Sequence, residues 1–463
     1  MEQPAAVILA AGRGTRMKSD LPKVLHPLCG RPMLDYVIAS LRKAGVRRII
    51  LVTAPDQRAL RDHFGNRIEY VVQTRPLGTG HALAQALPRL PRRGLAYVVS
   101  GDMPLASAAT LQALRRAIQD RTGGDRPGVP RNGMAAAALA TRTVDRTRGF
   151  GRIVRDAGGR FLRIVEEKDA SPEETSIREV NAGIYCVRTA EIRDALRQIR
   201  PANRQREYYL TDAVSLLAAG GRQVVTVDVP DPDEMIGINT RAELAEADAV
   251  IRRRILGRLM DAGVTVTDPA TTFVHEGVRV GRDTVLQPWT VLTGRTIIGS
   301  QCVIGPGARL HDAVLGRRVR VRDSTIEGSR LGDGTVVGPY AHLRPGTVVG
   351  QDVEIGNYAE MKQVRVGDRT KVHHKSYLGD AWIGTDVNIG AGTITCNYGL
   401  DRRKHRTTIG SGAYIGSDSM LVAPVRIGRG AVTGAGSVVT RDVPARALAV
   451  GVPARVIRRI GAA

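Results

Sequence analysis

Residues 331–356 read LGDGTVVGPYAHLRPGTVVGQDVEIG, and this stretch decides the fold of the second half of the chain. An aliphatic residue recurs at every sixth position, and a glycine usually follows it; the series is Leu331, Val337, Leu343, Val349 and Ile355. A period of six fits neither an α-helix nor ordinary hairpins and is typical of a hexapeptide parallel β-helix. Three hexads make one triangular coil, with the aliphatic side chain inside and the small residue at the corner.

The same period extends along the chain in both directions. Earlier members are Ile298, Ile304 and Leu310, and later members include Val366, Val372, Leu378, Ile383, Ile389, Ile409, Ile415, Leu421 and Ile427. Coils of this kind bury their apolar faces only against their neighbours, so the pattern predicts a solenoid. The register breaks at residues 311–330 and 395–408, where we expect loops that leave the coil.

The first half of the chain has a different pattern, in which short apolar runs alternate with amphipathic stretches. The expected strands are Ala6–Leu9, Arg48–Val52, Tyr70–Val72 and Ala96–Val99, and the expected helices include residues 33–44 and 106–119. Strands and helices in alternation predict a mostly parallel sheet with helices on both faces. Ligands of such sheets bind beyond the carboxyl ends of the strands.

Three segments follow from these patterns. Residues 1–239 are expected to form an α/β, Rossmann-like domain, and residues 263–463 a left-handed parallel β-helix. Residues 240–262 lie between them and read as one linker helix, because Leu244, Ile251 and Ile255 fall on one side. Thr240 and Glu243 have the spacing of a capping box at its start.

Composition excludes several classes of protein. The 463 residues contain no apolar run long enough to span a membrane, and the short apolar stretch near the N-terminus lacks the features of a secretory signal. Four widely separated cysteines indicate neither a zinc site nor a disulfide framework, which favours a reducing, cytoplasmic setting. The net charge of +23 raises a nucleic-acid hypothesis, but the arginines are spread along the whole chain without interleaved aromatic residues. We therefore expect neither a nucleic-acid nor a membrane partner.

The first strand leads into a motif that suits phosphate binding. Residues 9–17 read LAAGRGTRM, and LPK follows at residues 21–23. Glycines let the backbone turn and present N–H groups to phosphate oxygens, while Arg16 and Lys23 add positive charge. The motif is neither a Walker A loop nor a G-x-G-x-x-G dinucleotide fingerprint.

This motif resembles that of the sugar-nucleotide pyrophosphorylases. Together with the solenoid, it makes the chain similar over residues 5–450 to the family of bacterial bifunctional enzymes that are N-acetylglucosamine-1-phosphate uridyltransferases and glucosamine-1-phosphate N-acetyltransferases. The resemblance implies that the second half acetylates glucosamine 1-phosphate with acetyl-CoA. It further implies that the first half transfers UMP from UTP to the product and releases pyrophosphate.

The resemblance also assigns residues to the uridylyl-transfer site. Arg16 and Lys23 match the catalytic cations, and Asp102 and Asn239 match the ligands of Mg²⁺, a cation that prefers oxygen donors. Residues matching the nucleotide-binding positions are Leu9, Ala10, Ala11, Gly12, Gln73, Gly78 and Thr79, of which the last three read the uracil. Residues matching the sugar-binding positions are Gly151, Glu166 and Asn181, with Asn239 shared.

For the acetyl-transfer site the family pattern assigns the base to His374, whose ordinary pKa near neutrality suits this work. The adjacent His373 is the natural control. Residues matching the sugar-phosphate contacts are Arg344, Lys362, Tyr377, Asn388, Asn397, Tyr398 and Lys404, and those matching acetyl-CoA contacts are Ala391, Ser417 and Ala435. Gly399-Leu400 replaces the usual Asp-Gly and the loop is one residue longer, so Arg402 or Arg403 is an alternative to Lys404. A homotrimer is implied by the resemblance.

Two other functions remain open at this stage. A single-activity sugar-1-phosphate nucleotidyltransferase would keep the fold and use the β-helix only for assembly or regulation. The cluster of His374 and Tyr377 speaks against it. A non-catalytic scaffold would be expected to have lost Lys23, Asp102 or Asn239, yet all three are present.

Overall fold

The computed structural model describes residues 3–120, 134–145, 147 and 149–461. The chain divides into two compact units, residues 1–251 and 252–463. The division falls inside helix α8 (Arg241–Asp261), which begins at a capping box as expected. The Glu243 N–H donates to Oγ1 of Thr240 (3.2 Å), and the Thr240 N–H donates back to Oε2 of Glu243 (2.8 Å).

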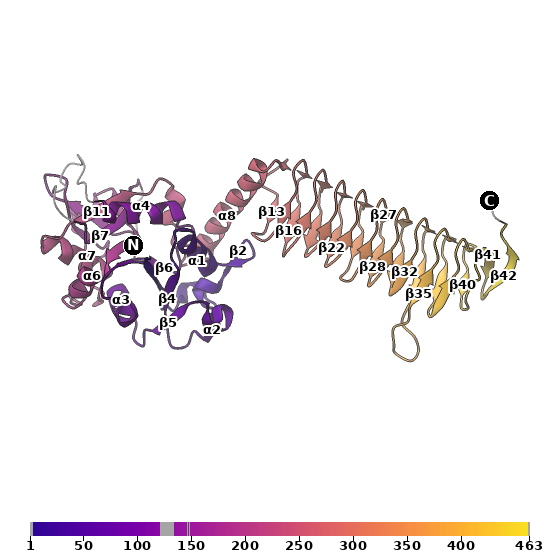
Figure 1. Ribbon diagram of the computed structural model, residues 1–463, viewed down its shortest axis with the longest axis horizontal. Coiled ribbons are helices and arrows are strands. Elements are labelled where there is room, and N and C mark those ends of the chain that lie inside the picture. The colour runs from indigo at the N-terminus through magenta and orange to yellow at the C-terminus, as the bar shows by residue number, and fades with distance from the viewer. Residues whose placement is uncertain (1–2, 121–133, 146, 148, 462–463) are drawn as a thin grey trace. The chain divides into compact units, whose positions relative to one another are not determined.

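The first unit is built on one mixed sheet with the strand order β11-β7-β10-β6-β1-β4-β5 (Figure 1). Its strands are β1 (Ala5–Leu9), β4 (Arg48–Thr53), β5 (Glu69–Val72), β6 (Leu95–Ser100), β7 (Ala137–Thr143), β10 (Glu179–Arg188) and β11 (Val224–Asp228), with β8 (Arg152–Arg155) and β9 (Phe161–Val165) attached to β10. β1 is parallel to both β4 and β6, whereas β10 is antiparallel to β6 and β7. Two short strands, β2 (Pro27–Leu28) and β3 (Arg31–Pro32), pair separately.

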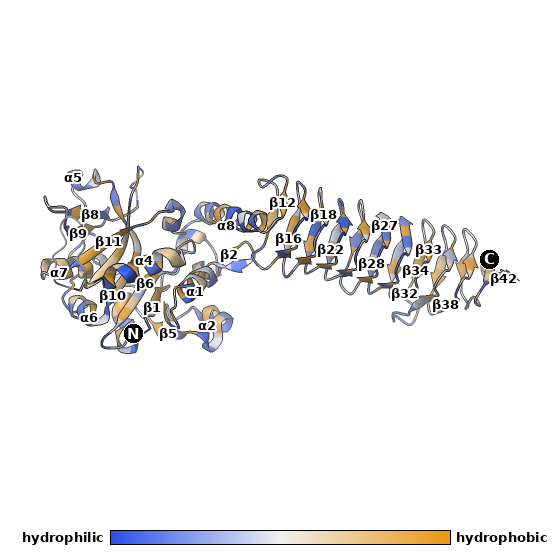
Figure 2. Ribbon diagram, turned by 45° about the horizontal axis from the view of Figure 1, so that its top comes forward, coloured by the Kyte–Doolittle hydropathy of each residue, from blue (hydrophilic) through white to orange (hydrophobic). Residues whose placement is uncertain are grey.

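Helices cover both faces of this sheet. They are α1 (Met33–Lys43), α2 (Arg58–Phe64), α3 (Thr79–Ala86), α4 (Ala108–Gln119), α5 (Pro172–Thr175), α6 (Thr189–Leu196) and α7 (Leu210–Ala219), with 3₁₀ turns η1 (Thr15–Met17), η2 (Lys23–Leu25), η3 (Gly65–Arg67), η4 (Leu87–Arg89) and η5 (Pro232–Met235). Alternate side chains of β1 enter opposite cores, because successive residues of a strand point to opposite faces. Ile8 packs in the core with α1, α2 and α4, and Val7 packs in the core with α3, α6 and α7. Figure 2 shows the apolar strands in orange between these helices.

The second unit is a parallel β-helix whose coils stack three sheets (Figure 1). The first face consists of β12 (Thr265–Val266), β15 (Val285–Leu286), β18 (Val303–Ile304), β21 (Arg320–Val321), β24 (Val336–Val337), β27 (Glu354–Asn357), β30 (Lys371–His374), β33 (Asn388–Ile389), β36 (Tyr414–Ile415), β39 (Val432–Thr433), β41 (Ala447–Gly451) and β42 (Ala454–Arg459). The second face consists of β13 (Phe273–Val274), β16 (Val291–Thr293), β19 (Arg309–His311), β22 (Thr325–Glu327), β25 (His342–Leu343), β28 (Glu360–Lys362), β31 (Tyr377–Gly379), β34 (Ile394–Cys396), β37 (Met420–Val422) and β40 (Val438–Val439). The third face consists of β14 (Arg279–Val280), β17 (Ile297–Ile298), β20 (Val314–Leu315), β23 (Arg330–Leu331), β26 (Val348–Val349), β29 (Arg365–Val366), β32 (Ala381–Ile383), β35 (Thr407–Ile409) and β38 (Val425–Ile427).

Aliphatic side chains fill the interior of the solenoid as the six-residue period predicted. Leu343 pairs with Met361 one coil on, and both side chains are fully buried. Buried threonines lie at the corners. The hydroxyl of Thr347 donates to the Arg344 carbonyl (2.8 Å), so this polar group is satisfied by the backbone although it is shielded from solvent. The predicted parallel β-helix and the predicted mostly parallel α/β sheet are both confirmed.

One expectation about the solenoid is wrong. Residues 311–330 form no loop, because β20, β21 and β22 continue the three faces without interruption. Leu310 pairs with Ile326, sixteen residues on, whereas Leu292 pairs with Leu310, eighteen residues on. The register break is therefore a shortening at the corners of one coil. The second expected loop is present, and it leaves the coil between β34 and β35 (Figure 1).

Candidate active sites

The order of strands reverses between β1 and β6, and this creates a crevice in the first unit. Strands β4 and β5 extend the sheet on one side of β1, while β6 joins on the other side. Leu9 and Ser100, the last residues of β1 and β6, pair directly, and the Gly101 N–H donates to the Leu9 carbonyl (2.9 Å). The glycine-rich motif and Asp102 therefore leave the sheet side by side, at the place where such sheets bind ligands.

The glycine-rich loop is shaped by a close contact with Lys23. Gly14 has a φ of 61°, and a Cβ atom at Gly14 would lie 2.8 Å from Cβ of Lys23. A larger residue is therefore excluded both by backbone conformation and by space. The loop continues into η1, which leaves the Arg16 side chain exposed beside the crevice.

Lys23 joins the two predicted magnesium ligands. Its ammonium forms an ion pair with Oδ2 of Asp102 and donates a hydrogen bond of 3.0 Å to Oδ1 of Asn239. Both oxygens therefore converge on one point, and a cationic group lies there. All three side chains are at least half-buried. The donor set fits a hard divalent cation, which takes carboxylate and amide oxygens together with phosphate and water.

The start of α8 fixes Asn239. Oε2 of Glu243 accepts hydrogen bonds from the backbone N–H groups of Asn239 (2.7 Å) and Thr240 (2.8 Å). The next residue, Arg241, donates to the Met17 carbonyl (3.2 Å) and to Nδ1 of His26 (3.2 Å). One arginine therefore ties together η1, which carries Arg16, the end of η2, which carries Lys23, and the segment of Asn239.

A narrow cavity of about 240 Å³ opens on one side of Asp102. Every residue assigned to nucleotide binding lines it: Leu9, Ala10, Ala11, Gly12, Gln73, Gly78 and Thr79. Lys23 and Asp102 form its wall toward the crevice. Gln57, Pro76 and Glu207 also line it, and no sequence motif pointed to them.

A wider cavity of about 630 Å³ opens on the other side of Asp102. The residues assigned to the sugar line it, and these are Gly151, Glu166, Asn181 and Asn239, with the catalytic candidate Arg16. Asp102 and Ser100 belong to both cavities. Two ligands bound in the two cavities would therefore meet at Asp102.

Two polar side chains in the wider cavity are preorganised. Asn181 donates to the Tyr185 hydroxyl (2.6 Å), and its Oδ1 accepts from the Gly183 N–H (3.1 Å). Glu166 accepts from the Thr211 hydroxyl (2.9 Å). Burial raises the pKa of Glu166, the Thr211 hydroxyl lowers it, and the neighbouring charges of Asp212, Asp169 and Glu207 raise it further. Gly151 must be small, since a Cβ there would lie 2.9 Å from Ile164.

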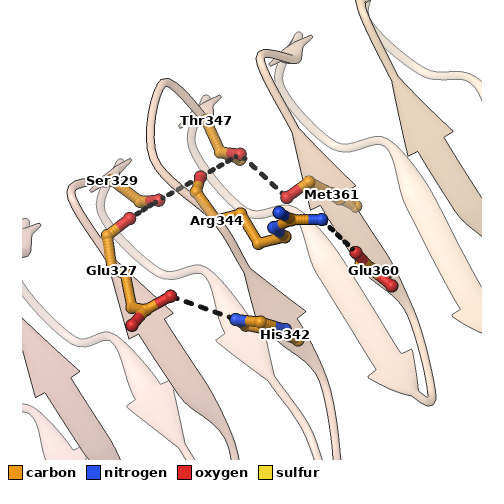
Figure 3. Close-up of polar contacts among 7 residues, drawn as sticks. All are labelled: Glu327, Ser329, His342, Arg344, Thr347, Glu360 and Met361. Atoms are coloured by element: carbon orange, nitrogen blue, oxygen red, sulfur yellow. Dashed lines mark hydrogen bonds and ion pairs between the residues drawn. The ribbon is translucent and has the colours of Figure 1, made fainter.

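In the second unit, the second face carries three of the predicted sugar-phosphate contacts. Arg344 and Lys362 occupy the same position in neighbouring coils, and Tyr377 follows one coil later, paired with Glu360. Arg344 donates to Oε1 of Glu360 (2.9 Å), which holds its guanidinium over the face (Figure 3). Figure 3 also shows a second pair at this face, between His342 and Glu327, with nitrogen and oxygen 3.2 Å apart.

The candidate base His374 ends strand β30 at the corner between the first and second faces. Nδ1 of His374 lies 2.8 Å from Oδ1 of Asn357, one coil earlier. An amide oxygen only accepts, so Nδ1 carries the proton and Nε2 presents a lone pair. Both residues line a cavity of about 600 Å³. The control residue, His373, instead lies 2.8 Å from Oε2 of Glu354.

The three acetyl-CoA candidates stand above His374 in the same column of successive coils. This register is fixed by the pairs Val372–Ile389, Ile389–Ile415 and Ile415–Thr433. The residues two positions later along the chain form the column, which is His374, Ala391, Ser417 and Ala435. Backbone hydrogen bonds run along it, such as Gly436 N–H to the Ser417 carbonyl (2.8 Å).

Of the remaining candidates, Asn397 and Lys404 share the carboxylate of Asp380, whereas Asn388 lies apart from them on the first face. Asn388 lies on the first face, and no hydrogen bond recorded for the described residues links it to Arg344, Lys362 or Tyr377. Asn397 begins the loop that leaves the coil and donates to Asp380 (2.5 Å), while Lys404 of the same loop lies 3.5 Å from the same carboxylate. Tyr398 pairs with Lys404 through the backbone and is exposed.

The described residues lack two features. In residues 3–120, 134–145, 147 and 149–461, no group of three or more His, Cys, Asp or Glu side chains is placed to hold a metal ion. A cation at Asp102 and Asn239 therefore needs oxygens from a substrate. No helix in the same part of the chain is long and apolar enough to cross a membrane.

The fold and the crevice together define a nucleotidyltransferase joined to a hexapeptide-repeat transferase. Family models agree with both parts: a MobA-like NTP transferase domain matches residues 6–207, a GMPPB C-terminal domain residues 269–366, and the bacterial transferase hexapeptide residues 406–441.

Whole-chain relatives identify the family. The chain is 46% identical to the bifunctional protein GlmU of Heliobacterium modesticaldum, over 97% of this chain and 96% of the relative. It is 45% identical to that of Pelobacter propionicus over the same shares, and 51% identical to that of Pelotomaculum thermopropionicum over 91% and 90%. The chain belongs to the GlmU family, and the predicted family is confirmed.

Proposed function

We propose that the chain makes UDP-N-acetylglucosamine in two steps, one in each unit. The first unit transfers UMP from UTP to N-acetylglucosamine 1-phosphate, and the second acetylates glucosamine 1-phosphate with acetyl-CoA. Membership of the GlmU family supports two activities. The observation that carries the assignment of uridylyl transfer is that two cavities, each lined by one predicted ligand set, share Asp102.

In the first unit, a phosphate oxygen of N-acetylglucosamine 1-phosphate attacks the α-phosphorus of UTP, and the bond from that phosphorus to pyrophosphate breaks. The attacking oxygen is already anionic, so the chain needs no general base. Its contribution is alignment of the two substrates and neutralisation of their charge. Arg16 and Lys23 stabilise the charge that develops on the phosphates.

Asp102 and Asn239 would hold Mg²⁺, which neutralises triphosphate charge when it is bound. Lys23 presently bridges both side chains, so its ammonium must turn toward the phosphates when a cation binds. Convergence of the two oxygens on one position supports this assignment. Glu166 and Asn181 orient the sugar from the opposite wall of the wider cavity.

In the second unit, whose product is the substrate of the first unit, the amine nitrogen of glucosamine 1-phosphate attacks the thioester carbon of acetyl-CoA. Nε2 of His374 takes a proton from that nitrogen, and the bond from carbon to sulfur breaks to release CoA. The hydrogen bond from Nδ1 to Asn357 supports this role, because it leaves Nε2 as the basic atom. Arg344 and Lys362 hold the sugar phosphate, while the column of Ala391, Ser417 and Ala435 accommodates acetyl-CoA.

We further propose a homotrimer for the acetyl-transfer site. In one chain, Asn388 and the contacts Arg344, Lys362 and Tyr377 occupy different faces of the solenoid. A neighbouring chain would close the open side of His374 and bring a second face to it. Hexapeptide β-helices associate in this way through their flat faces.

The proposed function is tested by omitting one substrate at a time. Full-length protein receives glucosamine 1-phosphate, acetyl-CoA, UTP and Mg²⁺, and release of CoA and pyrophosphate is measured separately. We expect pyrophosphate only when all three substrates are present, and CoA without UTP. Pyrophosphate release without acetyl-CoA would show that the first unit accepts the unacetylated sugar and would contradict the proposed order.

A further inference from the structure

The side-chain amide of Gln73 lines the narrow cavity, and its nitrogen is held by contacts with Gly78 and His81. Gln73 lines that cavity although only 5% of its surface is exposed. Its Nε2 donates to the Gly78 carbonyl (3.2 Å) and lies 2.9 Å from Nδ1 of His81. The described residues provide no recorded hydrogen-bond partner for its Oε1. The nitrogen end of the amide is therefore fixed, and the oxygen end is left for a ligand.

These two contacts determine which end of the amide faces the cavity. The Gly78 carbonyl can only accept, so a flipped amide would place one oxygen against another. His81 reinforces the same orientation when its ring is neutral. Burial lowers the pKa of His81, which favours the neutral ring. In the structure the amide nitrogen of Gln85 lies 3.2 Å from Nε2 of His81. A neutral ring has only one accepting nitrogen, so acceptance from Gln73 at Nδ1 puts the ring proton on Nε2 and requires the Gln85 amide to present its oxygen there.

An oxygen facing the cavity distinguishes two pyrimidines. Uracil has an N–H at ring position 3, which donates to an amide oxygen. Cytosine has a bare nitrogen there, which would meet that oxygen lone pair to lone pair. Sites that leave a buried polar group unpaired reject the wrong ligand strongly. A freely turning glutamine would instead accept either base, because its nitrogen end suits cytosine.

We propose that His81, which does not line the cavity, is a positioning residue that makes the site select uracil over cytosine by fixing the Gln73 amide. It rests on the proposed function of the narrow cavity as the nucleotide base site. His81 lies in the first turn of α3, two residues after the lining residue Thr79. The helix therefore carries both the wall of the base site and the group that orients Gln73.

The test compares full-length variants with UTP and CTP. Asparagine places its oxygen where Nδ1 of histidine lies, whereas glutamine places its oxygen near the position of Nε2. His81→Asn should therefore keep an acceptor for Gln73, and His81→Gln and His81→Leu should lose it. The measurement is kcat/KM for pyrophosphate release from each nucleotide with N-acetylglucosamine 1-phosphate, and acetyl transfer by the same preparations reports an intact chain. The exposed His63 supplies a control, His63→Asn.

The unmodified chain, His81→Asn and His63→Asn should share one preference for UTP over CTP. His81→Gln and His81→Leu should lower that preference about ten-fold or more, through a lower kcat/KM for UTP and a higher one for CTP. An unchanged preference in His81→Gln would overturn the role of His81 and leave the base site standing. If the unmodified chain turned over neither nucleotide, the base site and the role of His81 would both fall. If His81→Leu does not fold, the comparison of His81→Asn with His81→Gln decides.

Discussion

Lys23 donates a hydrogen bond of 3.0 Å to Asn239, although 216 residues separate them in the sequence. The same ammonium pairs with Asp102, so three segments of the chain meet at one cationic point. The lysine neutralises the Asp102 carboxylate and donates to the Asn239 amide oxygen before any substrate arrives. Under the proposed function, a divalent cation can therefore replace the ammonium at Asp102 without leaving a buried carboxylate unpaired.

Asp102→Asn should remove uridylyl transfer and leave acetyl transfer unchanged. The substitution keeps the shape of the side chain and removes the charge that Lys23 and a divalent cation need. We expect pyrophosphate release to fall about 100-fold or more. Asp62→Asn, on an exposed helix position, is the control. Parallel loss of CoA release in Asp102→Asn would contradict separate sites.

A fragment of residues 1–251 should retain uridylyl transfer, and a fragment of residues 1–240 should lose most of it. The longer fragment matches the first compact unit. The shorter one lacks Arg241 and Glu243, whose hydrogen bonds hold Met17, His26 and Asn239. We expect a drop of about ten-fold or more in pyrophosphate release. Equal activity of two folded fragments would show that the start of α8 is dispensable.

Much of the fold follows from the sequence because its signals are periodic. The aliphatic series around Leu343 predicts the solenoid, and the alternation of apolar runs predicts the sheet. The interpretation of residues 311–330 failed for a physical reason. Two corners that are each one residue shorter break the count between Leu310 and Ile326, although these two inward positions still stack.

Glu166→Gln should stabilise the first unit at neutral pH. Burial raises the pKa of Glu166 above its ordinary value of 4.5. The contribution of Glu166 to the free energy of unfolding is therefore fully present below about pH 4.5. It is lost as the pH rises through the folded-state pKa, because burial penalises the charged form. Glutamine keeps the oxygen that accepts from Thr211 and carries no charge. We expect a higher melting temperature than the unmodified chain at pH 7.5.

The difference between the two melting temperatures should shrink toward pH 4.5. Glu173→Gln is the control with the opposite sign, because the Ser171 hydroxyl lowers the pKa of this exposed carboxylate. That variant should gain no stability at pH 7.5. A Glu166→Gln variant that melts below the unmodified chain at pH 7.5 would refute the destabilising effect of the buried charge.

His374→Ala should lower acetyl transfer by about 100-fold or more, since general bases contribute effects of this size. Asn357→Ala should lower it less, about ten-fold, because the imidazole remains but its tautomer is no longer fixed. His373→Ala should change it little, since His373 pairs with Glu354. The measurement is CoA release at saturating glucosamine 1-phosphate. A larger effect of His373→Ala than of His374→Ala would reassign the base.

The sites were less predictable than the fold. Motifs located Asp102, Gln73 and His374, because each lies in a short run with a distinctive order of residues. Their supporting partners lie elsewhere in the sequence. Asn357 supports His374 from one coil away, and no local pattern marks it. The loop residue Lys404 stays a prediction, and its present partner is Asp380.

The solution mass tests the proposed trimer. We expect three times the chain mass of 49.8 kDa by analytical ultracentrifugation. A monomer that acetylates at an undiminished rate per chain would contradict a site completed by a neighbour. Dilution supplies the matched control, because only acetyl transfer should fall as the assembly separates.

Under the proposed acetyl-CoA assignment, the column above His374 sets a minimum reach for the acyl donor. Neighbouring strands of a sheet are about 4.8 Å apart, so the three steps from His374 to Ala435 span about 14 Å. A thioester delivered at one end and anchored at the other needs a flexible arm of that length. Short synthetic thioesters would deliver the same acetyl group without binding at the far end of the column. Deleting one complete coil would shorten the distance from His374 to Ala435 while the other coils stayed stacked.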